Sequence, residues 1–292
     1  AYSDKYKKKT LRLGDLLHLD KPHIQSRLKT MLEYKNLELG GCYHQAPMSY
    51  PALLSWCEKK AEQFAPYITD TGNYIAAALS NHQKVVLEAQ LGAMRDIDYG
   101  IFPYTSSSST ISAYGPIGAG IPGTLPDHIV GVLKAYSTCV GAGPFTAEKA
   151  MPEKWMESLR KSGGEYGAAT GRPRRVGPFD AVASAYGLKC QNADKIALTK
   201  LDVLSHMDEI PVITSYKLND EIITEFDPLD DLDSMTPVIQ MLPGWNTDIS
   251  KCRKYEELPE NARKYIETLE HLLNHEIQFI SVGAERLSLI HI

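Results

Sequence analysis

The sequence lacks the features that mark several large classes of protein. Its 31 Lys and Arg residues nearly balance its 36 Asp and Glu residues, which leaves a formal net charge of −5. Proteins that bind nucleic acid or anionic membranes through charge are clearly basic, so the composition argues against both classes. Its apolar runs, such as residues 129–133, end within a few residues, far short of the ~20 residues that span a bilayer. Small anionic ligands are still compatible, because they need only a few local cations.

Cysteine is scarce, and its spacing indicates no redox or metal chemistry. The five cysteines are odd in number and no two form a C-x-x-C pair, so neither a redox motif nor a zinc pattern is present. They are Cys42, Cys57, Cys139, Cys190 and Cys252. We expect idle thiols in a reducing compartment, which favours a cytoplasmic protein.

Familiar catalytic motifs are absent as well. The sequence contains no G-x-x-x-x-G-K-[ST] phosphate loop, no G-x-G-x-x-G after a predicted strand, no H-E-x-x-H and no G-x-S-x-G. His271 and His275 stand four residues apart, but no second pair of ligands accompanies them. We therefore expect no metal site within these residues.

The rest of the composition is that of a globular protein. It is 43% hydrophobic and 23% charged, and 292 residues allow one large domain or two ordinary ones. Such a chain can bury a full core without disulfides or a structural metal. The first residue is Ala1 rather than Met, so we expect either processing or a piece of a longer protein.

Hydrophobic spacing predicts helices in several places. Apolar residues at helical spacing predict helices over residues 24–32, 51–68 and 259–273, the last with Pro259 at its start. Asp127 after Pro126 favours a further helix over residues 127–136. Residues 1–75 are expected to be mostly helical.

Short apolar runs rich in β-branched residues predict buried strands between these helices. The predicted strands are residues 84–88, 195–200, 210–216 and 276–282. Residues 92–123 hold too many Gly, Ser and Pro for long elements. The alternation predicts an α/β layered fold, with a mostly parallel central sheet and flanking helices.

Two stretches carry charged groups suited to small anionic ligands or to guanine. Residues 167–177 hold three Arg within four positions between glycines, and guanidinium groups match carboxylates and phosphates with paired hydrogen bonds. A solvated basic turn is the alternative. Lys200 and Asp202 stand at a predicted strand end, where α/β sheets bind ligands. The carboxylate can accept two hydrogen bonds from guanine while the lysine stem lies along the base; an ordinary strand end is the alternative.

Two further stretches have the composition of binding turns. Residues 96–110 combine acidic residues, glycine and a Ser/Thr run, and their hydroxyls and free backbone N–H groups can hold a phosphate. A serine-rich surface loop is the alternative. Residues 137–145 contain two Gly and one Pro, which predicts a rigid turn with its backbone close to another group, or else a plain connection.

Taken together, in order and spacing, these stretches resemble one family, the adenylosuccinate synthetases, and the resemblance covers nearly the whole chain. The matching segments are residues 1–5, 11–16, 96–100, 136–145, 165–177, 198–204, 242–245, 258–259, 262–266 and 280–283. The resemblance implies an adenylosuccinate synthetase-like fold, similar to P-loop NTPases, as a single domain over residues 1–286.

The resemblance also implies a reaction. GTP phosphorylates the 6-oxygen of IMP, and the amino group of L-aspartate then displaces the phosphate. The product is adenylosuccinate, in the AMP branch of de novo purine biosynthesis, and Mg²⁺ is required. The implied enzyme is a ligase that forms a C–N bond, acts as a homodimer and is cytoplasmic, without a nucleic-acid or membrane partner.

The family's binding residues carry over to individual positions. The implied IMP-binding residues are Lys8, Gln90, Leu91, Ser106, Val140 and Arg172. The implied aspartate-binding residues are Ala168, Ala169, Thr170, Gly171, Arg172, Pro173 and Arg174. The implied GTP-binding residues are Arg174, Lys200, Leu201, Asp202, Ser281, Val282 and Gly283. Within these sets Ser106 holds the IMP phosphate, and Lys8 reaches the IMP phosphate in the partner subunit.

Several positions depart from the family pattern. Lys8, Ala169, Cys139 and Pro178 stand where the family usually has Arg, Thr, Arg and Trp, and Leu91, one position after Gln90, aligns with the family's IMP-binding Gln. These departures leave open a related ligase that uses another purine nucleotide as acceptor. A nucleotide-binding protein without catalysis is a further alternative.

Other parts of the family pattern lie outside these residues. The family's Gly-rich loop, its catalytic Asp and His, and the expected Mg²⁺ ligands precede the segment that matches Ala1. We therefore expect a fold incomplete at its N-terminus, no catalytic residue here, and an inactive, marginally stable chain with exposed strand edges. Residues 287–292 do not match the family and are expected to be a non-native tail.

Overall fold

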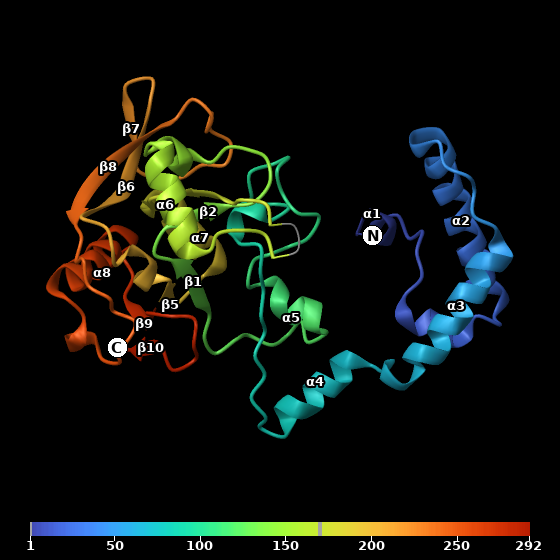
Figure 1. The fold of residues 1–292 in the computed structure, drawn as a ribbon. Coiled ribbons are helices and arrows are strands. Elements are labelled where there is room, and N and C mark those ends of the chain that lie inside the picture. Colours follow the sequence, from blue (N-terminus) through green and yellow to red (C-terminus); the bar gives the residue numbers. More distant parts are fainter. Residues whose placement is uncertain (1, 169–170) are drawn as a thin grey trace. The chain divides into compact units, whose positions relative to one another are not determined.

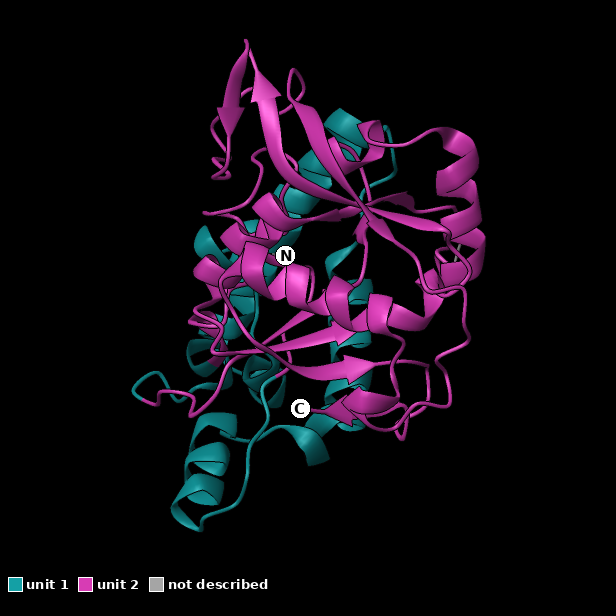
Figure 2. Cartoon of the chain, turned by 90° about the vertical axis from the view of Figure 1, so that its left-hand side faces the viewer, with its two compact units in different colours: residues 1–87, 116–123 teal, residues 88–115, 124–292 magenta. Residues whose placement is uncertain are grey.

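The computed structural model of the chain describes residues 2–168 and 171–292. The chain forms two compact units, drawn in different colours in Figure 2. The smaller unit comprises residues 1–87 and 116–123, and the larger unit comprises residues 88–115 and 124–292. The expectation of one domain over residues 1–286 remains a prediction, because two compact units can belong to one domain.

The smaller unit is helical, as the sequence predicted for this region. Its helices are α1 (Tyr2–Tyr6), α2 (Pro22–Tyr43), α3 (Tyr50–Phe64) and α4 (Thr71–Ser80), with 3₁₀ turns η1 (Leu13–His18) and η2 (Ala65–Tyr67). Ser49 caps α3 by accepting a 3.4 Å hydrogen bond from the Ala52 amide. Ile24 and Leu28 of α2 form a small core with Cys57 of α3. The helices expected over residues 24–32 and 51–68 are therefore confirmed.

The larger unit is organised around a four-stranded sheet with the order β1-β5-β9-β10. Strands β1 (Val130–Lys134), β5 (Lys195–Thr199) and β9 (Ile277–Ser281) run parallel, and β10 (Leu289–His291) is antiparallel to β9. The carboxyl ends of three parallel strands therefore meet at one edge of the sheet, which is where α/β folds bind ligands.

A second sheet lies in the same unit. Its strands are β4 (Phe179–Asp180), β6 (Glu209–Leu218), β7 (Glu221–Ile223) and β8 (Thr236–Pro243). Strand β6 pairs in parallel with β4 and antiparallel with β7 and β8, and Figure 1 shows β6, β7 and β8 lying side by side. A separate antiparallel pair joins β2 (Ser137–Cys139) to β3 (Arg175–Gly177).

Helices and short turns cover these strands. The helices are α6 (Glu153–Gly163), α7 (Ala181–Gln191) and α8 (Glu260–Leu273), together with the short α5 (Tyr114–Ala119), whose last residues belong to the smaller unit. The 3₁₀ turns are η3 (Ala93–Arg95), η4 (Thr146–Lys149), η5 (Leu201–Leu204) and η6 (Tyr255–Glu257). Helix α7 packs against α8, β6 and β1, while α6 packs against β3 and η5. The α/β class with a mixed sheet and flanking helices is confirmed, as are the predicted strands at β5, β6 and β9 and the predicted helix at α8.

The helix expected over residues 127–136 is wrong. This segment forms β1, paired with β5 over five residues. Val130 and Val132 are exposed on either side of the buried Gly131, and this alternation is typical of a strand. The Pro126–Asp127 capping signal was outweighed by the β-branched residues, which pack well on a pleated surface.

The strand expected over residues 84–88 is also wrong. These residues have no regular structure, and Val86 is 89% exposed. They stand where the chain passes from the smaller to the larger unit. An apolar run becomes a strand only when a neighbouring strand pairs with its N–H and C=O groups, and no such neighbour is present within the described residues.

The last residues of the chain are ordered. Leu289–His291 pairs with β9, and the Ile290 side chain is buried in the core of the larger unit. The suggestion that residues 287–292 have a non-native origin remains a prediction. Within the described parts of the chain, no helix is both long and apolar enough to cross a membrane.

A substitution at Gly131 tests the strand assignment. A Cβ atom there would stand 2.6 Å from Leu188 Cδ2 and 3.2 Å from Ala193 Cβ. We expect Gly131→Ala to lower the free energy of unfolding by roughly 1–3 kcal/mol through overpacking. Were the segment helical and exposed, the same change would raise it by about 1 kcal/mol. Denaturant unfolding followed by circular dichroism measures the sign.

Gly187→Ala is the matched control. Gly187 lies inside α7, and its added Cβ would meet Ala93 Cβ at an ordinary 3.8 Å. This change should raise the free energy of unfolding by up to about 1 kcal/mol. A Gly131→Ala protein as stable as this control would contradict the strand packing described for β1.

Candidate functional site

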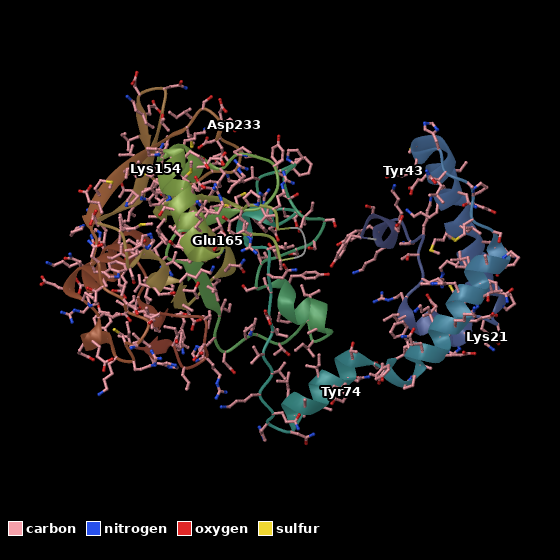
Figure 3. All side chains as sticks on the ribbon, viewed as in Figure 1. Lys21, Tyr43, Tyr74, Lys154, Glu165 and Asp233 are labelled. Carbon is pink, nitrogen blue, oxygen red and sulfur yellow. The ribbon has the colours of Figure 1, made fainter. Side chains whose placement is uncertain are left out.

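The candidate site is centred on the carboxylate of Glu165, which is labelled in Figure 3. The Glu165 side chain is fully buried and accepts four hydrogen bonds. Its Oε1 atom accepts from Lys134 Nζ at 2.9 Å, from the Tyr136 hydroxyl at 2.7 Å and from Lys200 Nζ at 3.0 Å. Its Oε2 atom accepts from Arg174 Nη1 at 2.8 Å. One carboxylate thus connects the ends of β1 and β5 with the residue preceding β3.

Local backbone geometry places Glu165 at this point. Helix α6 ends at Gly163, and its C-cap residue, Gly164, has φ +60° and lets the chain turn sharply. Just before it, a Cβ atom on Gly163 would clash with the Tyr136 hydroxyl, so only glycine allows the close approach. The Gly163 carbonyl accepts a further 2.6 Å hydrogen bond from Lys200 Nζ.

The hydrogen bonds determine the protonation state of Glu165. Burial by itself raises the pKa of this carboxyl, but the hydrogen bonds from Tyr136, Lys134 and Lys200 together lower the pKa to about 2. Burial lowers the pKa of Lys134, opposed by its hydrogen bond to Glu165. The centre therefore holds an ionised carboxylate with three cationic groups around it, which favours an anionic ligand nearby.

The described residues on the two sides of the arginine-containing loop pair with each other next to Glu165. The Arg174 amide donates to the Glu165 carbonyl at 2.9 Å, and the Gly167 amide donates to the Arg172 carbonyl at 2.8 Å. Gly171, with φ +63°, lies near the tip of this loop. Of the expected aspartate-binding residues, Ala168, Gly171, Arg172 and Pro173 are exposed and Arg174 is half-buried. Ala169 and Thr170 lie outside the described residues.

Arg175, the third arginine of the loop, is held by protein groups. Its Nε atom donates to Glu148 Oε2 at 2.6 Å, and its Nη2 atom donates to Glu148 Oε1. Its Nη1 atom donates to the Gly143 carbonyl at 2.7 Å. The Arg175 guanidinium therefore holds Glu148 and the turn after β2 together.

The expected guanine-binding residues gather at the carboxyl ends of adjacent strands. Lys200 adopts a left-handed conformation (φ +61°) directly after β5 and leads into η5, which contains Leu201 and Asp202. Ser281, Val282 and Gly283 stand at the end of β9, the parallel neighbour of β5. Leu201 and Val282 are buried in the core, so they can offer a ligand only backbone groups. Burial raises the pKa of the Asp202 carboxyl.

A second cluster brings together two of the expected IMP-binding residues. The Arg95 carbonyl accepts a 2.8 Å hydrogen bond from the Ser106 amide. The Arg95 guanidinium donates to the carbonyls of Val140 at 2.9 Å and Ala142 at 3.2 Å, and to Cys139 Sγ at 2.8 Å. Arg95 thereby holds the turn after β2 beside the Ser106 loop.

The turn after β2 is as tight as its glycines predicted. Gly141 and Gly143 have φ values of +87° and +105°, and a Cβ atom on Gly143 would clash with the Tyr104 side chain. Because Cys139 pairs with Arg175 in the β2–β3 register, the following Val140 and the preceding Arg174 lie at the same end of that pair. An expected IMP-binding residue and an expected aspartate-binding residue are therefore close neighbours.

Asp96 organises the Ser/Thr-rich loop from inside. Its buried carboxylate accepts from the amides of Asp98 at 2.9 Å, Tyr99 at 3.1 Å and Thr110 at 2.6 Å, and from the Ser109 hydroxyl at 3.2 Å. Burial raises the pKa of Asp96, but these hydrogen bonds together lower it by more than burial raises it, so the net shift is downward. The expectation of free N–H groups is wrong for these three amides, because Asp96 already uses them.

The remaining expected IMP-binding residues, Gln90, Leu91 and Lys8, are exposed. Gln90 and Leu91 are exposed in a segment without regular structure, and Leu91 has φ +77°. Lys8, also exposed and with φ +59°, follows α1 in the smaller unit. Their roles remain predictions.

Sequence reasoning did not single out Glu165, Tyr136, Lys134 and Arg95 as site residues. Glu165 and Tyr136 stand inside the matching segments, but neither type of residue forms a recognisable spacing with Arg174 or Lys200. The available signal was a lone carboxylate directly after two glycines and close to the arginine-containing loop. Across residues 2–168 and 171–292, no group of three or more His, Cys, Asp or Glu side chains is arranged to hold a metal ion.

Comparisons with known proteins agree on one family. The family model described as Adenylosuccinate synthetase matches residues 1–290. The adenylosuccinate synthetase of Carboxydothermus hydrogenoformans is 40% identical over 287 residues, which are 98% of this chain and 66% of that protein. The Staphylococcus aureus relative of the same name is 35% identical over 287 residues, again 98% of this chain and 66% of that protein.

A solved structure is similar as well. The structure of fully ligated adenylosuccinate synthetase from Plasmodium falciparum gives a TM-score of 0.88 at 33% identity, covering 100% of this chain and 68% of that one. The chain spans 66% of the length of the first of these curated relatives.

The depressed pKa of Glu165 predicts how stability depends on pH. Because the folded-state pKa of about 2 lies below the ordinary 4.5, the ionised carboxylate contributes stability that is fully present above pH 4.5. This stability is lost as the pH falls towards 2. We expect Glu165→Gln to flatten this part of the profile by up to roughly 3 kcal/mol. Unfolding free energies measured by denaturant titration at several pH values, from above 4.5 down to about 2, test this.

Asp180→Asn gives a control of opposite sign. The Asp180 carboxyl is buried and accepts a 2.7 Å hydrogen bond from the Tyr216 hydroxyl, and burial raises its pKa from 3.8 to about 6. Its ionisation therefore costs stability as the pH rises from 3.8 to 6. Asp180→Asn removes this ionisation, so the free energy of unfolding should depend less on pH between 3.8 and 6. If the free energy of unfolding of the native protein and that of Glu165→Gln change with pH in the same way below pH 4.5, the electrostatics described for Glu165 are wrong.

Proposed function

The chain belongs to the adenylosuccinate synthetase family, and on that premise we propose that the protein carrying it joins IMP to L-aspartate with GTP as co-substrate. GTP phosphorylates the 6-oxygen of IMP, and the amino group of aspartate then displaces the phosphate. The products are adenylosuccinate, GDP and phosphate. The proposal includes a homodimer in the cytoplasm, with Lys8 reaching the IMP phosphate of the partner subunit.

One observation carries the proposal. The Glu165 carboxylate accepts hydrogen bonds from Arg174 at 2.8 Å and from Lys200 at 3.0 Å. Arg174 belongs to the proposed aspartate loop, and Lys200 begins the proposed guanine-binding turn. A ligase must hold both co-substrates in one geometry, because most of its rate comes from positioning the reacting groups.

The residues of the loop suit a dicarboxylate. Arg172 and Arg174 provide guanidinium groups whose planar donors match carboxylate oxygens. Thr170 and the backbone of residues 168–173 are proposed to complete this site. Arg172 also contacts the IMP ribose and Arg174 the GTP side in this proposal, so the loop lies between all three substrates.

The turn after β5 suits guanine. Asp202 follows a buried strand, and its carboxylate can accept one hydrogen bond from guanine N1–H and one from the exocyclic amine. Its pKa is raised by burial, so its ionised form gains from two such donors. Ser281, Val282 and Gly283, at the end of the neighbouring β9, are proposed to close the other side of the base.

The IMP site is proposed to lie beside Arg95. Ser106 would hold the phosphate, with Gln90, Leu91 and Val140 around the nucleotide. The family's reaction uses Mg²⁺, which would neutralise charge on the transferring phosphoryl group. The described residues offer no cluster of His, Cys, Asp or Glu side chains to hold this ion.

The activity is tested directly with the protein that carries this chain. We expect adenylosuccinate to form from IMP, L-aspartate, GTP and Mg²⁺, measured by the absorbance change of the purine or by chromatography. Guanosine monophosphate replaces IMP in a parallel assay, because Leu91 and Ala169 leave the acceptor nucleotide open. If product forms with guanosine monophosphate but not with IMP, guanosine monophosphate is the acceptor instead of IMP. If no product forms with either nucleotide, the proposal is wrong.

Asp202→Asn tests the guanine-binding role. An amide presents one donor and one acceptor, so it loses the hydrogen bond from the exocyclic amine of guanine but can donate to the 2-oxo group of xanthine. One hydrogen bond to a charged group contributes about 1.5–3 kcal/mol, and the amide NH₂ of the variant also faces the exocyclic amine of guanine, donor against donor. We expect kcat/KM for GTP to fall by about 100-fold or more, while kcat/KM for xanthosine triphosphate rises. Steady-state kinetics with both nucleotides measure the change.

Asp220→Asn is the matched control for this substitution. Asp220 is in the β6–β7 hairpin and pairs with Lys217, and its side chain is 91% exposed. Its kinetics should match those of the native protein. Unchanged preference for GTP in the Asp202→Asn protein would exclude Asp202 from guanine binding.

A further inference from the structure

Glu165 connects two binding elements that are distant in the chain. We infer that Glu165 is a positioning residue that holds the guanine-binding turn through Lys200 and the aspartate loop through Arg174. The inference rests on the proposed function, because it assigns Glu165 a role in binding GTP and aspartate. It concerns a residue that contacts neither substrate in the proposal and acts through its two partners.

The two oxygens of Glu165 serve different elements. Oε2 accepts from Arg174, whereas Oε1 accepts from Lys134, Tyr136 and Lys200. A carboxylate has about four acceptor sites in all, and this one meets four donors, three of them on Oε1. Because the side chain is fully buried, water does not replace a donor that is lost. Loss of the carboxylate would therefore leave each of these side chains without one of its hydrogen-bond partners.

The contact to Lys200 fixes the turn that carries Asp202. Lys200 has φ +61°, a left-handed conformation that costs a non-glycine residue roughly 1–2 kcal/mol. Its Nζ atom is tied at both Glu165 Oε1 and the Gly163 carbonyl, at 3.0 and 2.6 Å. These contacts compensate for the strained backbone. The direction of η5, and hence of Asp202, follows from that conformation.

The contact to Arg174 fixes the base of the aspartate loop. Arg174 is held by its amide on the Glu165 carbonyl at 2.9 Å and by its guanidinium on Oε2 at 2.8 Å. Its carbonyl accepts a 2.9 Å hydrogen bond from Arg160 Nε. With the backbone anchored on both sides, Glu165 determines where the guanidinium points.

Glu165→Gln separates positioning from folding. Glutamine keeps the size of the side chain and one acceptor oxygen, but its amide nitrogen cannot accept a hydrogen bond. With the oxygen facing its three donors, the NH₂ group meets Arg174 Nη1, donor against donor. Arg174 is then released, and Lys200 faces a neutral oxygen instead of a carboxylate.

The experiment is a kinetic comparison of the whole protein that carries this chain with its Glu165→Gln variant. We expect KM for aspartate to rise about tenfold and KM for GTP to rise about threefold or more. The KM for IMP should rise less than either, because Ser106 and Val140 are held by Arg95 and only Arg172 of the proposed IMP site lies in the loop that Glu165 anchors. A merely structural role would lower the amount of active enzyme, and so the apparent kcat, without changing any KM.

Two variants on α6 control for charge and for stability. Glu157→Gln is the same substitution on the exposed Glu157, which pairs with Lys161 at 2.8 Å, and its three KM values should equal those of the native protein. Leu159→Ala removes a fully buried side chain and should destabilise the protein without raising the KM for aspartate or GTP. If Leu159→Ala reproduces the kinetics of Glu165→Gln, the effect reflects lost stability and the inference is wrong.

The outcomes also separate this inference from the proposed function. If the native protein forms no adenylosuccinate, the proposed function fails whatever the variants do. If the native protein is active and Glu165→Gln leaves the KM values for aspartate and GTP unchanged, the proposed function stands and the positioning role fails. A purely proportional rise in all three KM values, IMP included, would likewise contradict a role confined to the two elements.

Discussion

The burial of one charge governs the arrangement of the candidate site. A carboxylate removed from water is costly unless donors replace its hydration, and Glu165 meets this requirement with four donors from three segments. Removing any one donor would leave part of that cost uncompensated. The ends of β1 and β5 and the residue before β3 are therefore constrained together. The excess of cations over carboxylates that results is what an anionic substrate requires.

Elsewhere in the larger unit, other single charged side chains also hold loop backbone groups in place. Asp96 accepts hydrogen bonds from three backbone amides and a hydroxyl, and so shapes the loop that contains Ser106. Arg95, its neighbour, donates to carbonyls of the turn after β2. Lys149 donates to the carbonyls of Leu232, Asp233 and Met235 and holds a long connection before β8. In each case one side chain replaces regular secondary structure as the partner of loop backbone groups.

Several elements could be predicted from neighbouring residues alone. The stripe of apolar residues in α8 and the β-branched runs of β5, β6 and β9 are local patterns, and each formed the expected element. The errors came from segments whose state depends on partners. Residues 130–134 became a strand because β5 pairs with them, and residues 84–88 did not, because nothing described pairs with them. A capping signal and a short apolar run were too weak to decide either case.

By itself, the sequence determined the residue types available for binding and the family to which their order belongs. Arg172, Arg174, Lys200 and Asp202 could be named because guanidinium, ammonium and carboxylate chemistry is legible from residue type and spacing. Only the tertiary structure decided which of these groups act together. Glu165 and Arg174 are nine residues apart, but Lys134 and Lys200 are far from both in the chain and meet Glu165 only because β1 and β5 are parallel neighbours. The tertiary structure likewise determines that Arg175 pairs with Glu148 and that amides of the serine-rich loop donate to Asp96. The physical reason is that a buried polar group must be satisfied by whichever partners the packed chain brings to it, and sequence spacing does not specify those partners.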